Sequence, residues 1–137
     1  MSKNSQMHNV EIIMREMLEI QQKSKMFVNL LSEGESLSQS QLILLLQLKF
    51  NEGMKATEIA DFFNVTPGAV TSMCDKLEKL NLVQRVRESE DRRVVKMILT
   101  NSGEVKVEEL FLKFSQEKLT DIAKVLIDVN KLMSTIF

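Results

Sequence analysis

Residues 57–82 read TEIADFFNVTPGAVTSMCDKLEKLNL and contain two helical patterns separated by a tight turn at residues 64–65. Thr66 and Pro67 open the second helix, because threonine is a good N-cap and proline is favoured at the first helical position. The positions expected to face the core are Ile59, Ala60, Phe63, Val70, Met73, Cys74, Leu77 and Leu80. Two short helices joined by such a turn are typical of a helix-turn-helix motif.

After this motif the pattern changes from helical to strand-like. Residues 83–87 and 94–99 are apolar and β-branched enough to form strands, and they flank a charged tip at residues 88–92. We therefore expect a two-stranded β-hairpin, called the wing below, beside the helix-turn-helix. Asn81 stands between the two, where a left-handed cap of the preceding helix is expected.

Two more helices are predicted on either side of these elements. Ser38 and Gln41 have the spacing of a capping box, and the helix over residues 38–50 is apolar on every side, which indicates a central, buried position. Thr100 is expected to cap a further helix. The apolar content of that helix is Val105, Leu110, Leu112 and Phe114.

Apolar stripes occupy both ends of the chain. Apolar residues recur at helical spacing from Val10 to Leu31, and a heptad seam runs from Leu119 to Ile136. Such stripes at the ends of a small protein favour contact with a second copy of the same chain. The predicted dimer contacts are Val10, Ile13, Met17, Leu126, Val129, Met133 and Ile136.

The composition of the 137 residues excludes several kinds of site. One cysteine cannot form an internal disulfide or a Cys-rich zinc site, and one histidine, His8, is too few for a metal centre or a catalytic triad. We expect no metal, no cofactor and no enzymatic activity. Without a signal-peptide pattern or a run of about 18 apolar residues, we expect a cytoplasmic protein with no membrane partner.

The net charge of −1 hides an uneven distribution. Residues 64–99 hold seven basic and five acidic groups, whereas the segments before and after them are net acidic. Because double-stranded DNA attracts proteins mainly through its phosphates, a local excess of basic residues is what DNA binding requires. The excess coincides with the second helix of the motif and the wing.

The motifs between residues 37 and 103, about half of the chain, are specific in combination. They are LSQSQ at 37–41, EIA at 58–60, VTPGAVT at 65–71, DKLEKLNLV at 75–83 with Arg85, EDRR at 90–93 and LTNSG at 99–103. In these motifs and in the order of its elements, the chain resembles the MarR family of winged-helix transcription regulators. Three positions depart from the family pattern: Asn81 replaces glycine, Lys55 replaces a small polar helix cap, and Ser72 stands where arginine is frequent.

The resemblance implies a mainly α fold with a small β-wing, in which a winged helix-turn-helix domain is flanked by N- and C-terminal dimerisation helices. The chain, 1–137, would be a single MarR-like domain with its DNA-binding lobe at 37–100 and dimerisation helices at 6–33 and 101–137. The resemblance also implies a homodimer that binds a pseudo-palindromic operator in double-stranded DNA. Most such regulators are repressors, and a small-molecule effector releases them from the DNA.

The residues predicted to contact DNA lie in the second helix of the motif and at the wing tip. Small and hydroxyl-bearing residues would let the helix sit deep in the major groove, and a lysine further along would reach a phosphate. By resemblance, one wing arginine would enter the minor groove and Asp91 would hold the other as wing support. The predicted contacts are Thr66, Pro67, Gly68, Ala69, Thr71, Ser72, Lys76, Arg92 and Arg93.

The same residues allow other interpretations. The helix positions and the wing could be an ordinary solvated surface, and the winged fold could serve as a protein-interaction module without specific DNA binding. Cys74 is interpreted as a buried core residue rather than a redox sensor, because it lies on the apolar face of its helix. Three methionines, Met14, Met17 and Met26, could line a ligand pocket, although a dimerisation surface is the favoured interpretation of the first helix.

Overall fold

The computed structural model describes residues 2–115, 117 and 119–137. In these residues the elements follow in the order α1 (Lys3–Ser32), α2 (Gln39–Phe50), β1 (Met54–Lys55), α3 (Ala56–Phe63), α4 (Pro67–Lys79), β2 (Val83–Arg87), β3 (Val95–Leu99), α5 (Asn101–Phe111) and α6 (Leu119–Met133). This is the mainly α fold with a small β-wing that the sequence predicts. None of these helices is long and apolar enough to cross a membrane.

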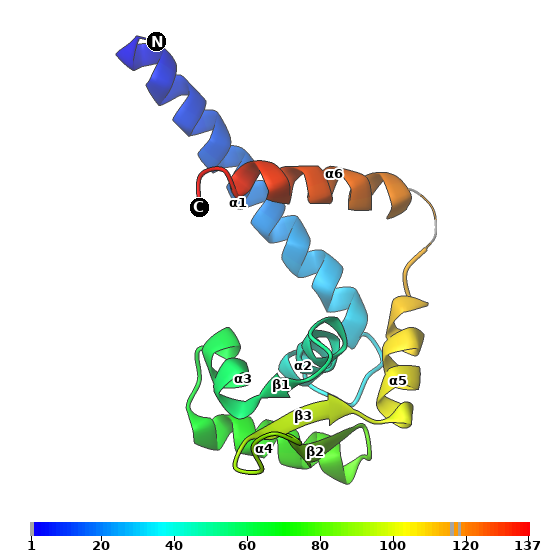
Figure 1. Ribbon diagram of the computed structural model, residues 1–137. Coiled ribbons are helices and arrows are strands. Elements are labelled where there is room, and N and C mark those ends of the chain that lie inside the picture. The colour runs from blue at the N-terminus through cyan, green and yellow to red at the C-terminus, as the bar shows by residue number, and fades with distance from the viewer. Residues whose placement is uncertain (1, 116, 118) are drawn as a thin grey trace.

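The elements are arranged as a compact lobe with two projecting helices (Figure 1). Residues 37–111, called the winged lobe below, contain α2 to α5 and the three strands. α1 leaves the lobe as a long helix, and α6 lies on the same side of the lobe as the free part of α1, away from α4 and β2. The second helix of the motif, α4, which is the predicted recognition helix, and the projecting helices therefore occupy opposite ends of the molecule.

The core of the winged lobe is built around α2. Leu42, Leu44 and Leu45 of this helix have no exposed surface, which confirms that a helix apolar on every side lies centrally. Two residues of α5, Val107 and Leu110, are buried in the same cluster. Two helices are described after residue 100. Of these, α5 packs into the winged lobe and α6 projects from it.

The sheet has three strands rather than the two expected, in the order β1-β3-β2 with all pairs antiparallel. The predicted hairpin is confirmed as β2 and β3, and the strand that the sequence does not indicate is β1, in which Met54 pairs with Met97 and Lys55 with Lys96. Gly53 makes this pairing possible. It adopts φ +102°, and a Cβ there would lie 2.8 Å from Ile98 Cγ2, so only glycine lets the chain approach β3 closely.

The helix starts follow the local capping signals. Ser38 Oγ accepts a hydrogen bond from Gln41 N at 3.2 Å while Gln41 Oε1 accepts one from Ser38 N at 2.9 Å, so the predicted capping box is confirmed. At Lys55, which has no side-chain acceptor, Glu58 Oε1 accepts from the Lys55 backbone N at 2.9 Å and supplies half of such a box. Asn81 adopts φ +61°, which confirms the predicted left-handed cap.

Some predicted details of the helices are wrong. α1 begins at Lys3, with the Ser2 side chain as its N-cap, three residues before the start predicted at residue 6. Leu80 is 51% exposed, because α4 ends at Lys79 and the chain turns away from the core at its cap. Ile136 follows the end of α6 and lies in a turn instead of continuing the helical seam.

Candidate nucleic-acid interface

α4 has one face anchored in the core and one face in solvent. Val70, Cys74 and Leu77 are at most 2% exposed and hold the helix on the lobe. The intervening positions therefore point outward. The predicted contact residues Thr66, Pro67, Gly68, Thr71, Ser72 and Lys76 are all exposed, and Ala69 is half-buried.

Two threonine hydroxyls stabilise the first turn of α4. Thr66 Oγ1 accepts a hydrogen bond from Ala69 N at 3.2 Å, which confirms its predicted role as N-cap. Thr71 Oγ1 donates to the carbonyl oxygen of Pro67 at 3.1 Å, and a hydroxyl that donates can also accept a hydrogen bond. These contacts fix the side chains at the exposed end of the helix before any partner arrives.

Gly68 lies in this first turn without a structural need for glycine. A Cβ at this position would have only Thr66 Oγ1 nearby, at 3.9 Å, which is an ordinary contact distance. Its φ is not in the left-handed region. The fold therefore does not require glycine at this position, and the missing side chain leaves the helix backbone accessible.

The wing tip is ordered by a short set of contacts around Asp91. Asp91 Oδ1 accepts hydrogen bonds from the backbone N of Arg93 at 3.0 Å and from its Nε at 3.2 Å. The pKa of Asp91 lies below its ordinary value, mainly because of the hydrogen bond from the Arg93 backbone and secondly because of the one from its guanidinium. Arg87 Nη1 donates to the carbonyl oxygen of Arg92 at 2.6 Å and braces the tip from β2. Arg93 is thus the arginine held by Asp91, yet its side chain is 92% exposed.

Arg85 connects the wing to α4, a role that the sequence did not indicate. Its Nη2 lies 2.8 Å from Asp75 Oδ1 and its Nη1 lies 2.8 Å from Glu78 Oε1, both on α4. The hydrogen bond with Asp75 contributes most to raising the pKa of Arg85, so this side chain stays charged. These pairs fix β2 against the recognition helix and neutralise one basic residue of the segment 64–99.

Cys74 is a core residue. It is 2% exposed, and burial raises the pKa of its thiol. A buried thiol of raised pKa is a poor nucleophile, so the interpretation as a small core side chain is confirmed.

The predicted dimer residues lie on the projecting helices and just beyond them. In the single chain all of them except the half-buried Met133 are exposed: Val10, Ile13 and Met17 by 40–56%, Leu126 and Val129 by 49% and 37%, and Ile136 by 69%. No described residue of α6 is buried, although the helix is strongly apolar on one side. A helix of this composition is stable in water only when that side is covered.

Comparison with known proteins assigns the fold to a family. A family model described as MarR family matches residues 37–95. The HTH-type transcriptional repressor MdtR of Bacillus subtilis (strain 168) is 41% identical over 78 residues, which are 57% of this chain and 50% of MdtR. The crystal structure of the transcriptional regulator BldR from Sulfolobus solfataricus is 30% identical, with a TM-score of 0.63, over 98% of this chain and 99% of BldR.

The chain belongs to the MarR family. The family and its named relatives are transcriptional regulators rather than enzymes, as the sequence leads us to expect. The chain spans about half the length of MdtR. A mutant of MarR from E. coli, crystallised with operator DNA, shares the fold with a TM-score of 0.64 at 19% identity, over 94% of this chain and 96% of that one.

Proposed function

We propose that this MarR-family chain is a sequence-specific regulator of transcription that binds double-stranded DNA as a homodimer. The observation that carries the proposal is the exposed first turn of α4, with its capped backbone, small side chains and a lysine further along the same face. A helix N-terminus of this kind fits the major groove, where hydroxyls and methyl groups read base edges. The E. coli relative crystallised with operator DNA has the same fold.

The wing would supply the second part of the contact. In Figure 1 the wing tip and α4 both lie on the side of the lobe that faces away from α1 and α6. We propose Arg93 as the minor-groove residue, which departs from the expectation that the arginine held by Asp91 only supports the wing. Asp91 orients the Arg93 guanidinium while leaving the side chain 92% exposed. An arginine oriented in advance loses less conformational entropy on insertion than a freely rotating one. Arg92 would then contact a phosphate.

The dimer would bring two lobes onto one operator. Pairing α1 and α6 with those of a second chain covers the apolar faces that the single chain leaves in solvent. Two lobes related by a two-fold axis read a pseudo-palindrome, with half-sites about one helical turn apart. Because the local positive charge is small, specific binding would depend on engaging both half-sites at once.

DNA binding is tested with duplexes selected from a random pool, followed by fluorescence anisotropy over a range of salt concentrations. Arg93→Ala is expected to weaken binding at least about fivefold and to lower the salt slope by about one. Arg15→Ala is the matched control, since it removes an arginine from α1 that pairs only with Glu11 among the described contacts. A dimer that binds no duplex at low salt would instead support a protein-interaction module.

Dimerisation is tested by sedimentation equilibrium with two equivalent substitutions. Val10→Glu, on α1, is expected to shift the protein towards monomer, because a charge in an apolar interface is left without a partner. Val65→Glu is the matched control, because Val65 lies between α3 and α4, outside both predicted dimerisation segments, and is 38% exposed compared with 52% for Val10. Equal effects of the two substitutions, or a monomeric parent protein, would contradict the proposed interface.

We further propose that the protein represses transcription and that a small-molecule effector releases it, as MdtR is itself named a repressor. Release requires an effector that binds the DNA-incompetent spacing of the two lobes better than the competent one. A reporter gene placed behind the selected operator should be expressed more strongly when the regulator is deleted. Lower expression after deletion would indicate an activator.

A further inference from the structure

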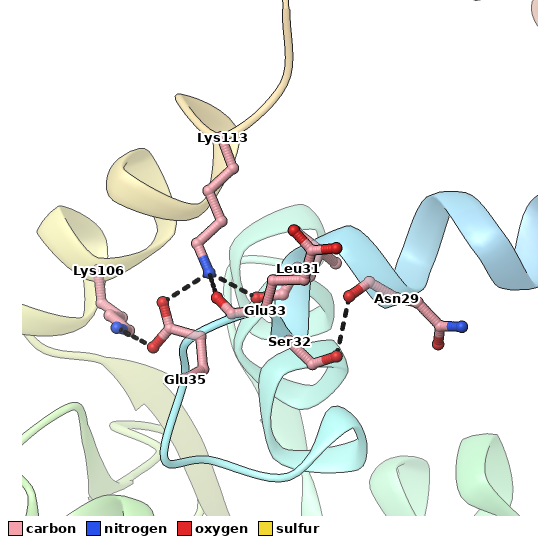
Figure 2. A network of polar contacts seen from close by, with 7 residues as sticks. All are labelled: Asn29, Leu31, Ser32, Glu33, Glu35, Lys106 and Lys113. Atoms are coloured by element: carbon pink, nitrogen blue, oxygen red, sulfur yellow. Dashed lines mark hydrogen bonds and ion pairs between the residues drawn. The ribbon is translucent and has the colours of Figure 1, made fainter.

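Three charged side chains meet where the chain enters and leaves the winged lobe (Figure 2). Glu35, in the loop between α1 and α2, lies 2.5 Å from Lys106 Nζ through one oxygen and 2.8 Å from Lys113 Nζ through the other. Lys106 belongs to α5, and Lys113 follows two residues after its end. One carboxylate therefore joins the entry loop both to α5 and to the segment that follows it.

Lys113 also caps the C-terminal end of α1. Its Nζ donates to the carbonyl oxygens of Leu31 and Glu33, each at 2.8 Å, in addition to Glu35. An ammonium has three donors, and these three acceptors use all of them. α1 has no basic residue in its own last turn, so the positive charge that a helix C-terminus favours comes from the far end of the lobe.

The Glu35 cluster is the most protected set of charges among the described residues. The Glu35 side chain is 14% exposed and the two lysines are 22% and 25% exposed, whereas every other described ion pair has both side chains at least 36% exposed. Partly buried pairs are screened little by salt and hold a defined geometry. Phe27 of α1 stacks on Phe114 beside them, with ring centroids 4.4 Å apart.

These contacts control how α1 sits on the lobe. A rotation of α1 against α5 would move the Leu31 and Glu33 carbonyls away from Lys113 Nζ and break the three-acceptor arrangement. α1 is 30 residues long, about 45 Å, so a small change of angle at this end becomes a large displacement elsewhere. The same change in a dimer alters the distance between the two recognition helices.

We propose that Glu35 is a positioning residue which fixes the angle between α1 and the winged lobe and thereby sets the half-site spacing that the dimer accepts. The part concerning spacing rests on the proposed DNA-binding function, whereas the part concerning the angle does not. Glu35 acts through Lys106 and Lys113 and has no predicted contact with DNA.

The angle is tested by measuring a distance within one protomer. Spin labels are attached at Gln22→Cys on α1 and at Lys79→Cys at the end of α4. Pulsed electron paramagnetic resonance then gives the distribution of distances between the two labels, and an excess of unlabelled protein ensures that both labels belong to one protomer. Both positions are exposed, whereas Cys74 is 2% exposed and stays unlabelled. Glu35→Gln, which keeps the shape and removes the charge, and Lys113→Met are each expected to broaden the distribution.

The matched control is Glu104→Gln. It removes the ion pair between Lys49 Nζ and Glu104 Oε2, 2.6 Å long, which joins α2 to α5 within the lobe and does not reach α1. The control should leave the distribution unchanged. An unchanged distribution in both Glu35→Gln and Lys113→Met, with the proteins folded by circular dichroism, overturns the proposal.

The functional part is tested with operators whose half-sites are moved apart or together by one and two base pairs. The full-length protein should prefer one spacing, and Glu35→Gln should reduce that preference roughly tenfold while the dimer is retained. A retained preference in a variant with a broadened distribution refutes the link between angle and spacing. If the parent protein binds no duplex although both variants broaden the distribution, the proposed DNA-binding function fails and the positioning role of Glu35 is supported.

Discussion

Replacing Gly103 by alanine tests how tightly α5 is seated on the turn between α4 and β2. Gly103 lies in the first turn of α5, and its backbone N donates to Thr100 Oγ1 at 3.0 Å. A Cβ at this position would lie 2.1 Å from the carbonyl oxygen of Leu82. That oxygen already accepts a hydrogen bond from the backbone N of Thr100 at 3.1 Å, so it cannot rotate away without losing a partner.

The expected cost follows from these contacts. Forcing a methyl group against fixed backbone costs about 1–3 kcal/mol, and losing the Thr100–Leu82 hydrogen bond costs about 1 kcal/mol more. Alanine is the better helix former by about 1 kcal/mol, which offsets part of the cost. We therefore expect Gly103→Ala to lower the free energy of unfolding by about 1–3 kcal/mol.

Gly68→Ala provides the matched control, because Gly68 lies in the first turn of α4 and the nearest atom to its added Cβ is at 3.9 Å. It should leave stability unchanged or raise it by about 0.4–1 kcal/mol. Urea denaturation of the three proteins at one common concentration makes the comparison, since the stability of an oligomer depends on concentration. Equal stability of Gly103→Ala and the parent, or equal losses for both variants, would refute the reasoning.

Three further outcomes follow from the site and the Glu35 cluster. Cys74 should react with iodoacetamide in urea and hardly at all in the native protein, and equal rates in the two states would contradict its burial. Arg85→Met should weaken binding to any duplex, because it leaves the Asp75 and Glu78 carboxylates unpaired on α4, where they repel phosphates. Fluorescence anisotropy at low salt measures this affinity, and an unchanged affinity would contradict the reasoning. The pKa of Glu35 is held below its ordinary 4.5 by Lys106 and then Lys113. The unfolded chain therefore takes up the proton first as pH falls, so stability should drop below about pH 4.5, and Glu35→Gln should flatten this drop in denaturation at pH 3–6.

The elements that could be predicted from the sequence are those with local signals. Ser38, Thr66 and Thr100 each cap a helix as expected, because an N-cap depends on residues only three positions apart. Asn81 adopts the left-handed conformation for a similarly local reason. The predicted recognition-helix residues come together on one exposed face, since helical periodicity alone separates them from Val70 and Leu77.

What could not be predicted depends on residues far apart in the chain. β1 has two residues, too few to show an alternating pattern, and it exists because Met54 meets Met97. Arg85 belongs to the net-basic segment 64–99, but its pairing with two carboxylates of α4 depends on how β2 packs against that helix. The contact between Glu35 and Lys106 joins positions 71 residues apart, which no local pattern indicates.

The capping of α1 by Lys113 has a consequence for the order in which the protein is made. Lys113 donates to a carbonyl oxygen 80 residues earlier, at Glu33. At about 5–20 residues per second, a ribosome reaches Lys113 roughly 4–16 s after it has added Glu33. During that interval the last turn of α1 lacks its cation, and Phe27 lacks the Phe114 ring on which it stacks. The C-terminal end of the longest described helix is therefore completed only after α2 to α5 have been synthesised.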